Sequence, residues 1–226
     1  RSQSVKEQAM NRKRKSILLA MAAISAAAII ALLYHFNYLP HPRYSGQAFG
    51  IDTYVSTVDM DGDGIDDQSD ILLSAREYVS QRPRYKSVYY GSGYPDDQYG
   101  VCTDVVAFGA LGAGYDLMEL VNEDIVSHPD IYDIEIIDKN IDFRRVGNLN
   151  IYFNRNSLSL TTDINQIGQW QGGDIVVFSD HIGIVSDNRN RRGIPFVIHH
   201  AHPMQLFYEE DILESHDDII GHYRLS

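Results

Sequence analysis

The 226-residue sequence contains one cysteine, Cys102, so an internal disulfide is excluded. Small exported domains often depend on disulfides, and this chain must be stable without them. An unpaired thiol in an oxidising compartment either packs as a small hydrophobic side chain or works as a nucleophile.

Basic residues are scarce outside the first fifteen positions. Residues 1–15 hold six lysines and arginines and one acid, which leaves thirteen basic and thirty acidic residues in the rest, a net charge of −17. Nucleic-acid-binding domains carry clustered basic residues, and this body has the opposite charge. We therefore expect no nucleic-acid partner.

A long apolar run follows the basic segment. Residues 16–39, "SILLAMAAISAAAIIALLYHFNYL", contain no Asp, Glu, Lys or Arg and are long enough for one helical crossing of roughly 30 Å of hydrocarbon. The basic flank predicts a cytoplasmic N-terminus and an exported remainder in a single-pass cell-membrane protein. No small-x-small cleavage site follows, so an uncleaved anchor is favoured over a signal peptide. Residues 40–58, with Pro40 and Pro42, are expected to form a linker.

The stretch 59–70, "DMDGDGIDDQSD", has the spacing of an EF-hand calcium loop. Asp occupies position 12 where the longer Glu is usual, and Gly64 permits the turn at position 6. An acidic solvated turn is the alternative interpretation. The expected oxygen ligands of a structural Ca²⁺ are Asp59, Asp61, Asp63, the Ile65 carbonyl, Asp67 through a water, and Asp70.

The remainder, residues 71–226, reads as one domain with helices first and strands second. Apolar spacing predicts a helix from Ile71 that Pro83 ends, and a second helix from Cys102 to Leu120. Four short strands are expected at 174–178, 181–187, 195–201 and 221–225. This order is typical of an α+β domain in which N-terminal helices pack on a C-terminal antiparallel sheet.

Cys102 and two histidines form the candidate catalytic group. Because Cys102 is expected at a helix N-terminus, the helix dipole should lower the pKa of its thiol. Antiparallel pairing would bring His181 and His199 side by side, one as base and one as the residue that orients it. His200 is the alternative third member, since neighbouring strand residues face opposite ways.

Two adjacent arginines, Arg144 and Arg145, lie in "DKNIDFRRVGNL" of this acidic protein. One of them could clamp a substrate carboxylate with two hydrogen bonds. The alternative is an internal ion pair with Asp142 or Asp104, and Asp104 could also cap the helix that begins near Cys102.

Five ordered motifs carry a resemblance to a known family. "YGVCTDVV", "NIDFRRVGNL", "GDIVVF", "HIGIVSD" and "GHYR" resemble the bacterial family of domain of unknown function 1287, and the strand pair resembles NlpC-type cysteine peptidases. The resemblance implies a papain-like fold over roughly residues 70–226. It also implies Cys102 as nucleophile, His181 as base and His199 as the orienting residue, with no cofactor for catalysis.

These features predict an extracytoplasmic cysteine hydrolase that cleaves amide bonds, with cell-wall peptides as the expected substrate. A catalytically silent, calcium-stabilised module that binds wall peptides fits the same residues. A thioester acyltransferase is the third interpretation, because cleft shape selects water or another acceptor.

Overall fold

The computed structural model describes residues 2–225, with side chains from Met10 onward. The chain divides into two compact units, Arg1–His41 and Pro42–Ser226. The first unit is dominated by helix α1 (Ser2–His35).

Helix α1 has the length and composition of a membrane-spanning segment. Its stretch Met10–His35 is 26 residues and about 39 Å long, is apolar beyond the basic residues at positions 12–15, and has no buried residue. The helix ends four residues before the expected limit of the apolar run, at Leu39. Asn37 adopts a φ of 57°, a left-handed conformation that asparagine tolerates and that no α-helix continues through.

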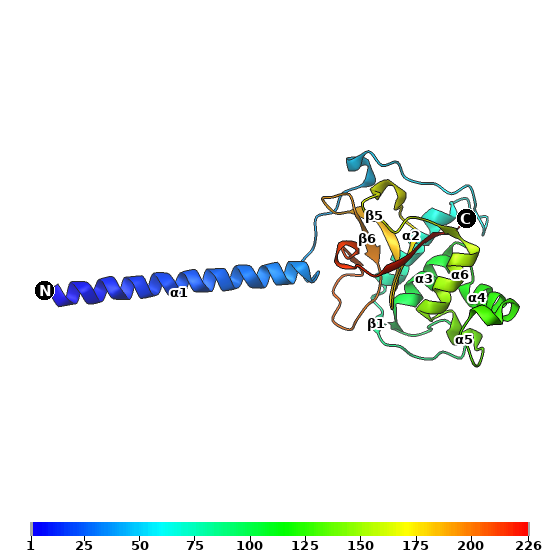
Figure 1. The fold of residues 1–226 in the computed structure, drawn as a ribbon, viewed down its shortest axis with the longest axis horizontal. Coiled ribbons are helices and arrows are strands. Elements are labelled where there is room, and N and C mark those ends of the chain that lie inside the picture. Colours follow the sequence, from blue (N-terminus) through cyan, green and yellow to red (C-terminus); the bar gives the residue numbers. More distant parts are fainter. Residues whose placement is uncertain (1, 226) are drawn as a thin grey trace. The chain divides into compact units, whose positions relative to one another are not determined.

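The second unit is an α+β domain, as expected. Its helices are α2 (Asp67–Ser80), α3 (Cys102–Gly112), α4 (Leu117–Ser127), α5 (Lys139–Asp142) and α6 (Val146–Asn156), with 3₁₀ turns at Gly46–Phe49, Pro129–Ile131, Ile167–Gln169 and Leu213–Ser215. Helix α2 packs on α3, and α3 packs on strand β5 (Figure 1).

Six antiparallel strands form the main sheet, in the order β3-β8-β4-β5-β6-β7. They are β3 (Leu158–Ser159), β4 (Ile175–Phe178), β5 (Ile182–Arg189), β6 (Pro195–Ile198), β7 (Glu209–Glu210) and β8 (Ile219–Arg224). All four expected strands are present, as β4, β5, β6 and β8. A separate parallel pair, β1 (Arg84–Tyr85) and β2 (Tyr99–Gly100), precedes α3.

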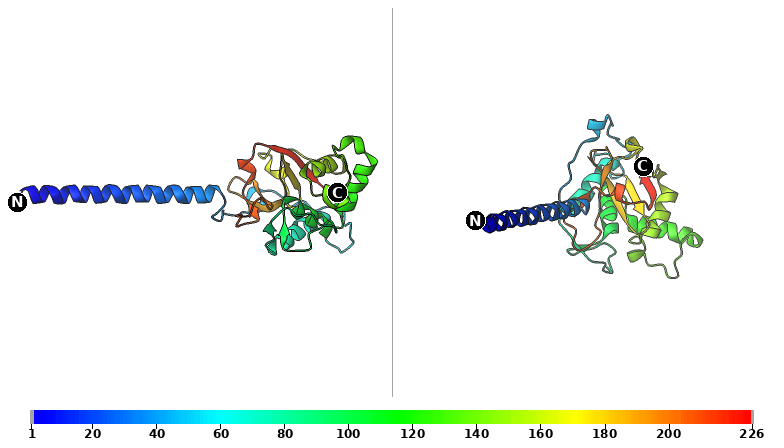
Figure 2. Two further views of the ribbon diagram at one scale, coloured as in Figure 1. Left: turned by 90° about the horizontal axis from the view of Figure 1, so that it is seen from below. Right: turned by 60° about the vertical axis from the view of Figure 1, so that its left-hand side comes forward.

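The central strands are buried on both faces, and alternate side chains enter two different cores. Ile182 and Ile184 join the core formed with α2, α3, α4 and α6. Val185 and Val197 join the second core, around Trp170 and Phe178. Figure 2 shows the strands and helices of this domain from two further sides. One face of the sheet therefore supports α3. His181 directly precedes β5, and His199 directly follows β6.

The expected helix from Cys102 to Leu120 is wrong in its second half. Helix α3 stops at Gly112, and Gly114 adopts a φ of +85°, which strains any residue with a side chain. Asp116 then caps α4 by accepting a hydrogen bond from the Met118 N–H. The apolar spacing continues across the break because both helices pack on the same core.

Residues 42–58 are part of the domain, whereas a linker was expected over 40–58. Tyr44 pairs with Arg189 at the end of β5 through two backbone hydrogen bonds of 2.8 and 2.9 Å. Ser56 is buried, and its N–H donates to Asp66 at 2.8 Å. Pro42, Gly46 and Gly50 interrupt regular structure here without releasing the chain from the domain surface.

Candidate active site

Cys102 is the first residue of α3, where the helix meets the beginning of β5. The half-buried thiol packs against the main core and accepts a hydrogen bond from the backbone N–H of Ile182. Ile182 follows His181 directly, so the only sulfur nucleophile lies beside the strand end that carries the expected base. Within residues 2–225, no hydrogen bond joins Cys102 Sγ to an imidazole directly.

The expected lowering of the thiol pKa is wrong in this conformation. Burial raises the pKa of Cys102 to about 11, and the hydrogen bonds from the Ile182 and Thr103 N–H groups only partly oppose that effect. The negative charge of Asp104 contributes to the raised pKa. Desolvation of a thiolate therefore outweighs the favourable helix N-terminus, and the resting thiol is neutral at physiological pH.

The two expected histidines do meet. His181 Nε2 lies 2.9 Å from His199 Nδ1, and the ring planes are nearly perpendicular. The register of β5 and β6, continued by one residue, sets His199 opposite Gly183, so His181 is its diagonal neighbour on the same face. A Cβ at Gly183 would lie 3.2 Å from His199 Cβ, so glycine leaves room for the imidazole.

Glu210 is a third member of this group and forms a hydrogen-bond chain with His199 and His181. His199 Nε2 lies 3.1 Å from Glu210 Oε2, and both residues are buried. Glu210 is not distinguished in the sequence, because β7 is two residues long and lies in an acidic segment. Glu210 is brought beside β6 by the pairing of β7 with that strand, in which Val197 lies opposite Glu210. Only the folded sheet shows this pairing.

The hydrogen bonds assign the protons of the two imidazoles. A carboxylate only accepts, so His199 Nε2 carries the proton and its Nδ1 accepts from His181 Nε2–H. In the neutral ring of His181, Nδ1 is then the unprotonated, basic nitrogen. Burial, with a smaller contribution from the neighbouring His199, lowers the pKa of His181 to about 3. The resting pair is thus a neutral thiol and a neutral imidazole.

His200 lies outside this chain. Its ring contacts Tyr85 and Tyr208, with centroid distances of 5.3 and 5.1 Å, and is buried. Among the described residues, its Nδ1 has no hydrogen-bond partner. Burial lowers its pKa to about 4. Of the two adjacent candidates, His199 is the one that contacts His181.

Arg144 forms the internal ion pair and not an open clamp. Its Nε and Nη2 bind the two oxygens of Asp104 at 2.6 and 2.9 Å, and both side chains are buried. Asp104 Oδ2 also accepts from the Val101 N–H at 2.8 Å, and Arg144 Nη1 donates to the Val88 carbonyl at 2.6 Å. The pair therefore holds the turn into Cys102 in place.

Arg145 is the exposed member of the arginine pair. Its Nε lies 3.7 Å from Asp142 Oδ1, a loose contact, and about half of the side chain is open to solvent. An exposed pair of this kind contributes little stability. Arg145 is consequently the arginine of the two whose guanidinium remains accessible to a ligand.

The acidic loop lies apart from the cysteine and histidines. One oxygen each of Asp59, Asp61 and Asp63 lies within 4.8 Å of the others. Asp67 does not face outward with them: it is buried, accepts from the Met60 N–H at 2.7 Å, and binds the Tyr115 hydroxyl. The expected role of Asp67 as a ligand through water is therefore wrong, because its carboxylate joins the loop to the turn after α3.

Comparison with known proteins agrees with the extent of this domain. The model of the family described as "Domain of unknown function (DUF1287)" matches residues 72–225. The uncharacterized protein YijF of Escherichia coli (strain K12) is 36% identical over 151 residues, which cover 63% of this chain and 72% of that protein. No solved structure matches the chain. The chain belongs to the DUF1287 family.

Proposed function

We propose that the domain is a cysteine hydrolase of amide bonds, with Cys102 as nucleophile, His181 as base and His199 as the residue that orients His181. The observation that carries the proposal is the Glu210–His199–His181 hydrogen-bond chain. This chain ends at His181, and the next residue, Ile182, has the backbone N–H that contacts the thiol. A nucleophile, a base and a third group that orients the base are the parts that such catalysis needs.

The proposed reaction begins from the neutral pair. His181 Nδ1 takes the thiol proton while Sγ attacks the amide carbonyl carbon, and the backbone N–H of Cys102 stabilises the oxyanion. The C–N bond then breaks, and the proton passes from His181 to the leaving amine. Water attacks the thioester with His181 again accepting the proton, which releases the carboxylic acid and the thiol. Because the proton leaves Sγ while Sγ attacks the carbonyl carbon, no free thiolate has to form in the buried site.

Several features support a papain-like, NlpC-type arrangement for this chemistry. The nucleophile starts a helix that packs on an antiparallel sheet, and the base directly precedes strand β5 of that sheet. The imidazole uses Nε2 for its orienting partner, which leaves Nδ1 for the thiol. The exposed guanidinium of Arg145 is the proposed contact for a substrate hydrogen-bond acceptor, whereas His200 Nδ1 is buried and closed to substrate.

The proposed location follows from helix α1. With α1 as an uncleaved anchor and the basic residues before it in the cytoplasm, the acidic domain faces the cell wall. Peptide stems of the wall are then the proposed substrate. They are rich in amide bonds and are within reach of a membrane-anchored domain.

To test this, the full chain, purified in detergent, is incubated with wall peptide fragments, and the masses of the products are measured. We expect pairs of products whose masses sum to that of the fragment plus one water. Cys102→Ala should form no such products, and the control His128→Gln should form them as the wild type does. Intact fragments with wild-type protein would contradict the hydrolase. Products joined to an added amine would identify the acyltransferase instead.

The raised thiol pKa favours a second candidate, a catalytically silent module that binds wall peptides. In that case wild-type protein and Cys102→Ala bind the fragments with equal affinity, and neither cleaves them. Calorimetry on both proteins, with the mass measurement above, separates the two functions.

A further inference from the structure

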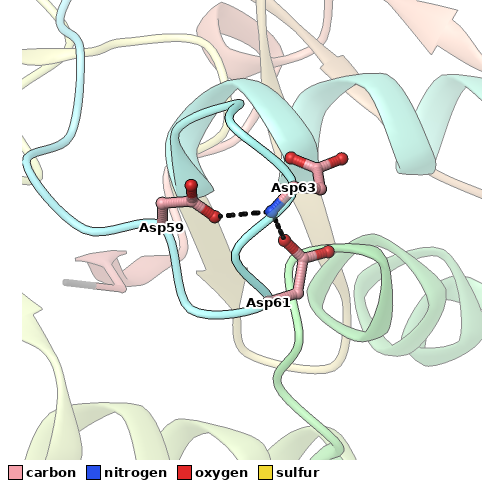
Figure 3. A group of neighbouring side chains, drawn as sticks. All are labelled: Asp59, Asp61 and Asp63. Atoms are coloured by element: carbon pink, nitrogen blue, oxygen red, sulfur yellow. Dashed lines mark hydrogen bonds between the residues drawn. The ribbon is translucent and has the colours of Figure 1, made fainter.

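The loop before α2 gathers exposed carboxylates around one point. Asp59, Asp61 and Asp63 each direct an oxygen into a region less than 4.8 Å across, and Figure 3 shows Asp59 and Asp61 both bonded to the Asp63 N–H. The three groups are exposed, so by themselves they indicate only an acidic turn.

Asp70, in the first turn of α2, supplies the observation that a turn does not explain. It is 6% exposed, and its Oδ2 has no hydrogen-bond partner among the described residues. The charges of Asp63, Asp61 and Asp59 act on this carboxylate, so it lies near the other three. A buried, unpartnered carboxylate beside three more is costly unless a cation neutralises it.

The remaining acids of this stretch already have protein partners. Asp66 accepts from the Ser56 N–H at 2.8 Å and from the Ser69 hydroxyl at 2.6 Å. Asp67 binds the Met60 N–H and the Tyr115 hydroxyl. Asp66 and Asp67 are thus bonded to Ser56 and Tyr115, outside the loop. The hydrogen bonds of Asp59, Asp61 and Asp63 are to N–H groups of the loop itself, and Asp70 Oδ2 has none among the described residues.

We propose that Asp59, Asp61, Asp63 and Asp70, with the Ile65 carbonyl, bind one Ca²⁺ that fixes the start of α2. Carboxylate and carbonyl oxygens are the ligands of hard cations, and Ca²⁺ accepts six to eight of them in flexible geometry. Mg²⁺ demands a near-ideal octahedron and gives up its waters reluctantly, so a loop with three exposed ligands suits it less well. This site does not depend on the chemistry of Cys102.

The contacts of the loop show what the ion stabilises. A Cβ at Gly114 would lie 3.2 Å from the Asp61 backbone N, so the loop rests directly on the turn between α3 and α4. Tyr115 in that turn binds Asp67. Calcium therefore connects α2 to the end of α3, the helix that begins at Cys102.

The test titrates calcium chloride into the full chain in detergent, follows heat and thermal unfolding, and repeats the titration with magnesium chloride. We expect one Ca²⁺ per chain, a rise in the unfolding temperature that EDTA reverses, and at least tenfold weaker Mg²⁺ binding. Asp61→Asn and Asp70→Asn should each weaken Ca²⁺ binding at least tenfold, while Asp130→Asn, an exposed substitution elsewhere, leaves it unchanged.

Asp70→Asn has a second expected effect. Without metal it should unfold at a temperature equal to or above that of the wild type, because the buried unpaired charge is gone. Absence of binding up to about 10 mM, above the range of weak extracellular calcium sites, would overturn the proposal. Undiminished affinity in Asp70→Asn would overturn the four-carboxylate set.

Discussion

His181 Nε2 and His199 Nδ1 lie 2.9 Å apart, and Glu210 on the far side of His199 determines which of the two nitrogens holds the proton. This arrangement leaves His181 Nδ1 as the base. The hydrogen-bond chain runs from the Glu210 carboxylate through the His199 imidazole to the His181 imidazole. Each of the three residues therefore has a different expected response to substitution.

His199 should act as a positioning residue for His181. His199→Ala removes the acceptor for His181 Nε2–H and should lower kcat at least about 100-fold, within the range of general acid–base effects. His199→Asn should recover part of that loss, because its amide oxygen can accept the same hydrogen bond. Steady-state kinetics on amide substrates, with KM as the second readout, test this.

The matched comparison is His200→Asn, the adjacent residue on the opposite face. We expect its kcat to change far less than that of His199→Ala, since His200 does not contact His181. Equal kcat for wild type and His199→Ala would remove His199 from the mechanism.

The thiol should behave as a buried, neutral group in the absence of substrate. With a pKa of about 11, roughly one thiol in ten thousand is ionised at pH 7, because each pH unit below the pKa is a factor of ten. The iodoacetamide labelling rate of Cys102 should rise about tenfold per pH unit from pH 7 to 10. Mass spectrometry on timed samples measures the rate.

Unfolded protein is the control for this labelling. Its cysteine should approach a plateau near pH 9, as expected for a thiol with an ordinary pKa of about 8.5. A plateau below pH 8 in the folded protein would mean that the thiolate is stabilised, contrary to the burial seen here.

Acid should destabilise the domain through its buried histidines. Burial lowers the pKa of His199 to about 3, so between pH 6.5 and 3 the unfolded state binds a proton that the folded state does not. Stability must then fall as the pH falls through this window. For His199 the loss is about 2 kcal/mol between pH 7 and pH 5, if each pKa unit counts about 1.4 kcal/mol.

Urea unfolding at pH 7 and pH 5 measures this loss. The difference between the two free energies of unfolding should be smaller in His199→Asn than in the wild type. It should be unchanged in His128→Asn, whose histidine is exposed in the native state. Identical pH dependence in all three proteins would rule out the linkage for His199.

The Arg144–Asp104 pair should be essential for stability near Cys102. Arg144→Met leaves the Asp104 carboxylate buried with only the Val101 N–H as a partner, which should cost about 3–5 kcal/mol of the free energy of unfolding. Arg144→Met with Asp104→Asn should recover part of this, because the orphaned charge is gone. Denaturant unfolding of the two variants measures the recovery; a double variant less stable than Arg144→Met would contradict it.

Local patterns predicted the elements whose neighbours in sequence are also their neighbours in space. The four strands followed from their apolar residues, and the meeting of His181 with His199 followed from antiparallel pairing of adjacent strands. The spacing of the acidic loop made Asp67 and Asp70 equal candidates, and the structure separates them: Asp67 binds Tyr115, whereas Asp70 Oδ2 has no partner among the described residues.

What the sequence could not predict depends on tertiary packing. The thiol pKa is governed by burial under β5, which the helix-start position of Cys102 does not reveal. Arg144 had Asp142 and Asp104 as possible partners, and only the fold selects Asp104. Glu210 lies in a two-residue strand, too short to give a periodic pattern.

The most direct test of the central claim, that Cys102 and His181 act as one catalytic unit, is a double-mutant cycle on amide hydrolysis. Cys102→Ala and His181→Ala should each lower kcat at least about 1,000-fold, and the double variant should be no slower than the worse single variant, since residues that act together are non-additive. If either single variant keeps wild-type activity, or if the two losses multiply, the thiol and the imidazole do not work together.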